Sequence, residues 1–102
     1  MSIKALLTKI LTALTLTLET VDSAQTTVGA NSNVWLQTNV QKTGKKPIAL
    51  VGYYIQGSGN TRCLPYANYL TTAQDQVNTA VYNVASTSAT VTIRYHILYQ
   101  KA

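Results

Sequence analysis

Few side chains in this sequence of 102 residues can carry acid–base or metal chemistry. The chain has three acidic residues, one histidine and one cysteine, namely Glu19, Asp22, Asp75, His96 and Cys63. General acid–base catalysis and metal binding need several such groups close together, and these five are spread along the sequence. We therefore expect a protein that is not an enzyme and that holds neither a cofactor nor a metal ion.

Charged residues are also scarce. They make up 11% of the sequence, against roughly 25% in an average soluble domain. Lysine and arginine outnumber acidic residues by eight to three, which gives a net charge of +5. A basic excess suits nucleic-acid binding, but the lysines cluster only within residues 42–46, and no nucleic-acid-binding module is recognisable. A basic nucleic-acid-binding protein therefore stays a lesser alternative, and we expect no nucleic-acid partner.

The single cysteine excludes an internal disulfide, so the fold does not depend on oxidation. A membrane helix needs roughly 20 mostly apolar residues, and the N-terminal apolar stretch is interrupted by Thr8, Lys9 and Thr12. We therefore expect no membrane span. A secretory signal that is cleaved near Ser23-Ala24 is a second interpretation of this stretch, although Lys9 breaks its apolar core. The mature chain would then begin at Gln25.

The N-terminal stretch has the spacing of a coiled-coil helix. Ile3, Leu7, Ile10 and Leu14 follow one another at intervals of four and three residues, and Ser2 is a suitable N-cap. A helix of three turns is marginal in water, so it must pack on other chains. Two further leucines widen the apolar stripe, as in the helices of a three-stranded bundle. The predicted trimer interface on this helix consists of Ile3, Leu6, Leu7, Ile10, Leu11 and Leu14.

From Leu14 the apolar period changes to two. Residues 14–21 alternate between apolar and polar positions, which predicts a half-buried strand, and a continuous helix as far as Thr20 is the alternative. Further strands are separated by turns rich in Gly, Ser, Thr and Asn. They are expected over residues 34–40, 48–55, 77–84 and 90–99, with an edge or irregular strand over 62–70 that contains Pro65.

The same alternation assigns faces to the strands. In residues 34–40 the even-numbered positions are expected inside and Trp35 outside, and in the last strand the odd-numbered positions from Val91 to Tyr99 share one face. Residues 48–55 are almost continuously apolar, which predicts burial on both faces, one of them against a neighbouring chain. Six or seven such strands predict an antiparallel, jelly-roll-like β-sandwich head over residues 14–102, preceded by the helix of residues 1–13.

The aromatic residues are seven tyrosines and one tryptophan, with no phenylalanine. Tyrosine and tryptophan combine a flat apolar face with a polar group. This combination suits stacking on sugar rings and also suits partly hydrated contacts between subunits. A short stretch beside the Gly-rich residues 56–60 combines two tyrosines with an arginine and an asparagine. The candidate contacts to a receptor or glycan are therefore Arg62, Tyr66, Asn68 and Tyr69, with packing between strands or subunits as the alternative.

Three segments of the sequence resemble small structural proteins of tailed phages and prophages of Gram-positive bacteria. They are Met1–Leu11, the stretch Lys46–Ile55 with the Gly-rich loop after it, and the closing Thr90–Ile93. The resemblance rests on the order of the elements and on the sequence of one strand. It implies a fibre, spike, receptor-binding or head-decoration protein in which a short helix joins a β-sandwich head, commonly as a trimer.

The resemblance also implies where the protein acts. We expect a virion component that is assembled in the host cytoplasm as a homotrimer and that is attached to other virion structural proteins. A glycan of the host surface is its candidate ligand. The alternative from a different class is a secreted, adhesin-like carbohydrate-binding module, which the secretory interpretation of the first residues would require.

Overall fold

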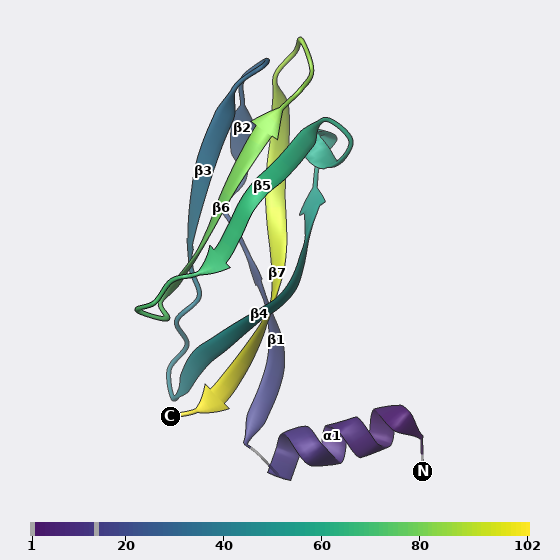
Figure 1. Ribbon diagram of the computed structural model, residues 1–102, viewed down its shortest axis with the longest axis vertical. Coiled ribbons are helices and arrows are strands. Elements are labelled where there is room, and N and C mark those ends of the chain that lie inside the picture. The colour runs from purple at the N-terminus through teal and green to yellow at the C-terminus, as the bar shows by residue number, and fades with distance from the viewer. Residues whose placement is uncertain (1, 14) are drawn as a thin grey trace.

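The described part of the chain folds into one short α-helix, one 3-10 helix and seven strands (Figure 1). The structure is a computed structural model that describes residues 2–13 and 15–102, with residues 11–13 described by their backbone alone. The helix-interface predictions for Leu14 and for the side chain of Leu11 therefore lie outside the described residues. The elements are α1 Ile3–Ala13, β1 Leu16–Asp22, β2 Thr26–Val28, β3 Asn33–Asn39, β4 Lys45–Gln56, the 3-10 helix η1 Ser58–Asn60, β5 Cys63–Leu70, β6 Gln76–Asn83 and β7 Ala89–Lys101.

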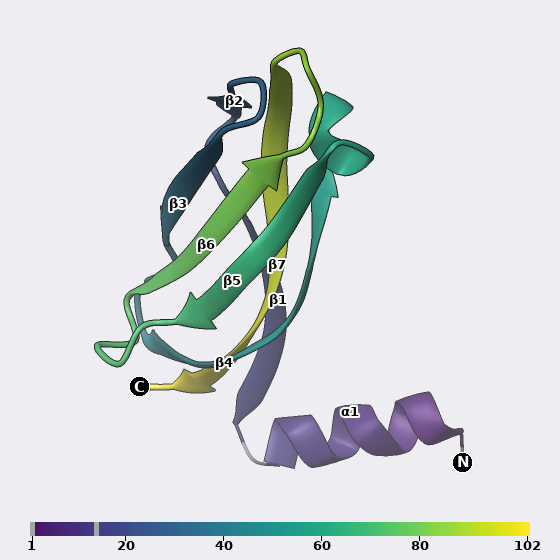
Figure 2. The same ribbon diagram turned by 45° about the horizontal axis from the view of Figure 1, so that its top comes forward.

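The strands form two antiparallel sheets (Figures 1 and 2). In the first, β7 pairs with β1 and β2 along one edge and with β4 along the other. In the second, β6 lies between β3 and β5. We call these the β7 sheet and the β6 sheet. The prediction of a mainly antiparallel β protein with one short N-terminal helix is confirmed.

The core lies between the two sheets. Val91, Ile93, Tyr95, Ile97 and Tyr99 of β7 are fully buried, as the alternation predicts. The β6 sheet contributes residues from all three of its strands, including Leu36, Cys63 and Val81. The hydroxyl of Tyr99 donates to the carbonyl oxygen of Val40 at 2.6 Å, so this buried polar group is satisfied.

The helix begins and ends where the sequence indicates. Ser2 accepts a hydrogen bond from the backbone N–H of Ala5 at its Oγ, at 3.0 Å, which confirms the predicted N-cap. The helix ends at Ala13, so the alternative of a continuous helix to Thr20 is wrong. Thr15 has a φ of 58°, and the chain turns there into β1. The helix projects away from the two sheets, and its principal contact is with β1 (Figures 1 and 2).

Two strands differ from the expected burial. In β1 the leucines lie on the outer side of the β7 sheet, because Leu18 pairs with Leu98, whose side chain points away from the core. In β4 no residue from Ile48 to Ile55 is fully buried, although Leu50 and Ile55 pack against the core. The reason is that β4 is an edge strand, which among the described strands pairs with β7 alone. Burial of its other face against a neighbouring chain stays a prediction.

The two ends of the β region are held differently. At one end, η1 packs against the start of β7, where Gly57 has a φ of 94° and Gly59 is buried. At the other end, the backbone N–H of Lys101 donates to the carbonyl of Thr15, and that of Ala102 donates to the carbonyl of Gly44. The C-terminus therefore lies beside the junction between α1 and β1 (Figure 1).

Candidate functional site

The acidic residues are engaged with polar neighbours. Glu19 accepts hydrogen bonds from Nζ of Lys45 at 2.6 Å and from Nζ of Lys42 at 3.1 Å. The Arg94 guanidinium binds Asp22 through two nitrogens, at 2.8 and 3.1 Å, and this pairing lowers the pKa of Asp22. Thr71 donates to Asp75 at 2.7 Å. Glu19 and Asp22 are thus paired with basic side chains, and Asp75 is held by a hydroxyl.

The remaining chemically active groups stand apart from one another. His96 lies on the outer side of the β7 sheet, with its ring 6.0 Å from that of Tyr54. Cys63 is buried in the core, and its burial raises the pKa of the thiol. Among residues 2–13 and 15–102, no group of three His, Cys, Asp or Glu side chains is placed to hold a metal ion. No helix in the described ranges has the length and hydropathy of a membrane span.

The structure brings together two of the four residues that the sequence suggested as glycan contacts. Tyr66 and Tyr69 both lie on the outer side of the β6 sheet and are about half exposed. Asn68 points the other way, where its Oδ1 accepts a hydrogen bond from Thr79 at 2.8 Å. Arg62 precedes β5, and its Nη1 lies 3.5 Å from the hydroxyl of Thr87. Asn68 therefore does not share a surface with the tyrosines, and Arg62 lies beside the turn that precedes β7.

A bulge in β5 explains this grouping. The register with β6 shifts between Pro65 and Ala67, so Tyr66 is the extra residue. In a regular strand Tyr66 and Asn68 would share a face and Tyr69 would lie on the other. The bulge reverses the alternation after Tyr66 and places Tyr69 on its side instead. The proline was the sequence signal for an irregular strand, but it did not fix the position of the bulge.

Trp35 joins the two tyrosines in one aromatic surface. Its ring centroid lies 6.4 Å from that of Tyr66 and 6.5 Å from that of Tyr69, with interplanar angles of 69° and 72°. The register of the strands explains these contacts. Trp35 of β3 and Ala67 of β5 both lie opposite Ala80 of β6, so Trp35 is level with the part of β5 that carries the two tyrosines. Tyr82 and Leu64 extend the surface along the same side. We call the outer side of the β6 sheet that carries Trp35, Leu64, Tyr66, Tyr69 and Tyr82 the aromatic face.

Sequence reasoning placed Trp35 on the outer side of its strand but did not include it among the site residues. The signal that was available is the alternation of residues 34–40, which the structure confirms. What could not be read from the sequence is that β3 and β5 lie on either side of β6. That arrangement brings Trp35 next to two tyrosines that are about 30 positions further along the chain.

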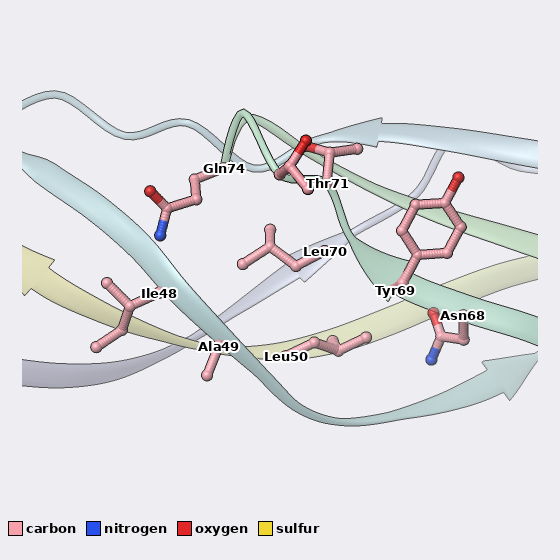
Figure 3. A pocket seen from close by; sticks show the side chains of 9 residues that line it. Ile48, Ala49, Leu50, Asn68, Tyr69, Leu70, Thr71 and Gln74 are labelled. Carbon is pink, nitrogen blue, oxygen red and sulfur yellow. The ribbon is translucent and has the colours of Figure 1, made fainter.

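A groove runs between β4 and the end of β5 (Figure 3). Its volume is ≈ 520 Å³, and it is open to solvent. Ile48, Ala49 and Leu50 form one wall, and Asn68, Leu70 and the turn after β5 form the other. The groove exists because the β7 and β6 sheets diverge along this edge, which leaves the inner side of β4 only partly covered.

The N-terminal helix exposes several large apolar side chains. Ile3 is 87% exposed, and Leu6, Leu7 and Ile10 are each about half exposed. Every described side chain of the helix is exposed, so the β region covers neither its apolar nor its polar side. The predicted stripe is thus present as a free surface for its four described members.

A second apolar surface continues from the helix. Leu18, Leu98 and Ala49 lie side by side in the register of β1, β7 and β4. They lie on the outer side of the β7 sheet, where Leu98 is two residues along β7 from His96. Because β1 begins at Leu16, directly after the helix, this row and the helix stripe lie at the same end of the molecule (Figure 1).

Comparison with known proteins finds no matching family model, no similar curated protein and no similar solved structure.

Proposed function

We propose that the protein is a structural component of a phage particle, a homotrimer whose N-terminal helices bundle and whose jelly-roll-like β-sandwich heads project from the particle. The observation that carries this proposal is the exposed apolar stripe of the helix. An isolated helix of 11 residues is only marginally stable in water. The side chains of Ile3, Leu7 and Ile10 therefore need cover that the chain does not supply.

The spacing of the stripe favours copies of the same helix as that cover. Intervals of four and three residues are those of a left-handed coiled coil, in which each chain buries the same positions against its neighbours. The outer row of Leu18, Leu98 and Ala49 would continue the contact from the helices onto the β7 sheets. In such a trimer the β7 sheet faces the threefold axis, and the β6 sheet faces outward.

The assignment to a phage particle comes from the resemblance of Met1–Leu11, Lys46–Ile55 and Thr90–Ile93, together with the scarcity of charge. Like charges on copies around a symmetry axis repel one another, so a surface of neutral polar groups is easier to assemble. The proposed attachment is to other virion structural proteins through the helical end, after assembly in the host cytoplasm.

Two alternatives have less support. A secreted carbohydrate-binding module that begins at Gln25 would lack β1, which pairs with seven residues of β7. Removing it would open a long edge beside Tyr95 and Ile97 in the core. A nucleic-acid-binding protein would need free cations on one surface, whereas Lys42 and Lys45 are paired with Glu19, and Arg94 is paired with Asp22.

Sedimentation velocity of the full chain at micromolar concentration tests the trimer. We expect the mass of three chains for the wild type and a shift towards monomer for the double variant Leu7→Glu/Ile10→Glu, because each charge would be buried three times in the bundle. Ala5→Glu, on the opposite side of the helix, is the matched control and keeps the trimer. A monomeric wild type, or an unchanged mass in the double variant, would contradict the proposal.

The location on a particle needs a separate measurement. Mass spectrometry of phage particles purified from the strain that encodes the chain should detect it in stoichiometric amounts. A peptide that begins at Gln25, found in the culture medium and not in particles, would favour the secreted module instead.

A further inference from the structure

We infer that the aromatic face is a binding site for a neutral saccharide, with Trp35 at its centre and Tyr66 and Tyr69 on either side. This inference goes beyond the proposed function and does not depend on the oligomeric state, because the whole site belongs to one protomer. It revises the contacts suggested by the sequence by adding Trp35 and leaving out Arg62 and Asn68.

The first support is the arrangement of the rings. Each tyrosine meets Trp35 edge to face, so the three rings form a continuous surface and do not stack on one another. Ala80, a small side chain on this side of the sheet, lies opposite Trp35 and is completely covered. Aromatic rings held with a free face offer the apolar surface on which the C–H groups of a sugar ring can stack.

The second support is that both tyrosines are held in place by amide side chains. Nδ2 of Asn33 donates to the hydroxyl of Tyr66 at 2.7 Å, and Nδ2 of Asn78 donates to the hydroxyl of Tyr69 at 3.3 Å. In these bonds each hydroxyl is the acceptor, so its own proton is not used by the amide. The rings are therefore preorganised, which lowers the entropy lost on binding, and two donors remain to meet sugar hydroxyls.

One amide oxygen on this side of the sheet has no partner among the described residues. Oδ1 of Asn78 is buried and makes no hydrogen bond to any residue in the described part of the chain. An unpaired buried acceptor is unfavourable, so this oxygen gains a partner if a small shift of the Asn78 side chain lets it accept a hydrogen bond from a ligand hydroxyl.

The third support is the distribution of charge. The strands β3, β5 and β6 contain no Asp, Glu, Lys, Arg or His, whereas β1, β4 and β7 contain all of the charged residues found in strands. The polar groups of the β6 sheet are therefore amides and hydroxyls alone. Such a surface has no ion to pair with a phosphate, sulfate or carboxylate, so we expect a ligand without charge.

The size of the site favours more than one sugar ring. The ring centroids of Tyr66 and Tyr69 lie 6.4 and 6.5 Å from that of Trp35, one on either side of it. Trp35 lies against both, so the three rings span more than a single pyranose can cover. The occupant is therefore a neutral oligosaccharide or a stretch of polysaccharide.

The site can be tested with the full chain, because Trp35 is its single tryptophan and reports directly on the aromatic face. A glycan array that carries neutral and charged saccharides selects the probes. The strongest neutral binder is then titrated up to about 10 mM while tryptophan fluorescence is followed, which reveals even millimolar affinity. We expect a saturable change in emission with at least one neutral saccharide.

Variants locate the binding. Tyr66→Ala and Tyr69→Ala should each weaken affinity by about tenfold or more, since each removes one stacking surface. Tyr54→Ala is the matched control, because Tyr54 is similarly exposed, at 45% against 54% for Tyr66, but lies on the β7 sheet. Trp35→Ala, followed by calorimetry, should abolish binding, and Trp35→Phe should retain the fold and part of the affinity if the alanine variant is unstable.

Several results would overturn the inference. They are an array without a neutral binder, affinity that survives in Tyr66→Ala and Tyr69→Ala, and a binder that needs Arg62. Sedimentation of the same variants separates this inference from the proposed trimer. If Tyr66→Ala lowers the mass of the assembly, the aromatic face is a protein contact and not a saccharide site, whereas a monomer that binds sugar contradicts only the trimer.

Discussion

Glu19 is the most strongly perturbed acid among the described residues. Hydrogen bonds from Lys45, and then from Lys42 and Thr17, lower its pKa from 4.5 to about 2, against the opposing effect of partial desolvation. Lys42 also lies 5.4 Å above the ring of Tyr99, whose hydroxyl reaches the carbonyl of Val40. The carboxylate therefore connects β1 to the first residue of β4 and to the turn before it, at the end of the molecule where the helix joins β1.

This ion pair predicts how stability depends on pH. Because the folded pKa of Glu19 is depressed, its contribution to the free energy of unfolding is fully present above pH 4.5 and is lost as the pH falls towards 2. In urea unfolding we expect Lys45→Gln to cost about 1 kcal/mol at pH 7 and almost nothing near pH 2. Lys46→Gln, the neighbour without an ion pair to any described residue, is the control. An equal loss at both pH values would show that Lys45 acts through packing.

Residue by residue, alternation predicted apolar positions better than polar ones. It assigned the inner and outer sides of residues 34–40 and of β7. It could not reveal that Thr79 and Asn83 are completely buried, because their burial depends on partners distant in sequence. Thr79 bonds to Asn68 and Tyr95, and the amide of Asn83 donates to the carbonyls of Val28 and Gly29.

Among the elements, η1 shows how the Gly-rich residues 57–60 are used. A Cβ atom on Gly59 would collide with Cγ1 of Val91 and would lie 3.0 Å from the carbonyl oxygen of Thr90. The Oγ of Ser58 accepts a hydrogen bond from the backbone N–H of Thr90 at 3.0 Å. The segment therefore closes one end of the core between β4 and β5.

Gly59→Ala should destabilise the fold by about 1–3 kcal/mol, because the core at this end must move to admit a methyl group. Gly29→Ala is the matched control. Its Cβ would meet nothing closer than the side chain of Ser32 at 3.5 Å, so its effect should stay within about 0.5 kcal/mol. Chemical denaturation compares the two variants. Equal stability of both would mean that η1 does not pack on Val91 as described.

The helix and the strands differ in how far local sequence determined them. The cap at Ser2 and the change of period after the helix are local signals, and both boundaries were predicted from them. The burial of β4 is not a local property, because it depends on which strands lie beside it. The run from Ile48 to Ile55 is apolar enough for a central strand, and yet in the protomer it lies at an edge.

For the whole molecule, the two sheets divide the properties of the surface between them. The β7 sheet carries the helix, the ion pairs and the outer leucine row, and the β6 sheet carries the uncharged aromatic face. Length and composition predicted one domain with few charges, but not this division. It arises from pairing between strands that are far apart in the sequence, such as β1 with β7.

The proposed trimer predicts different roles for two similarly exposed leucines. Leu18, at 53%, is on the β7 sheet, and Leu64, at 59%, is on the β6 sheet. Leu18→Glu should weaken self-association about tenfold or more, since a charge would be placed against the neighbouring chain. Leu64→Glu should leave association unchanged. Sedimentation equilibrium measures both, and the reverse order would mean that the β6 sheet faces the axis.

The hydrogen bonds of Lys101 and Ala102 to the segments beside β1 and β4 fix which end of the molecule is available for additions. A tag or cargo fused after Ala102 would emerge next to the base of the helix, where the proposed trimer places the neighbouring subunits and the attachment to the particle. The turn of residues 84–88 lies at the opposite tip (Figure 1), so an inserted epitope there would be carried farthest from the attachment point.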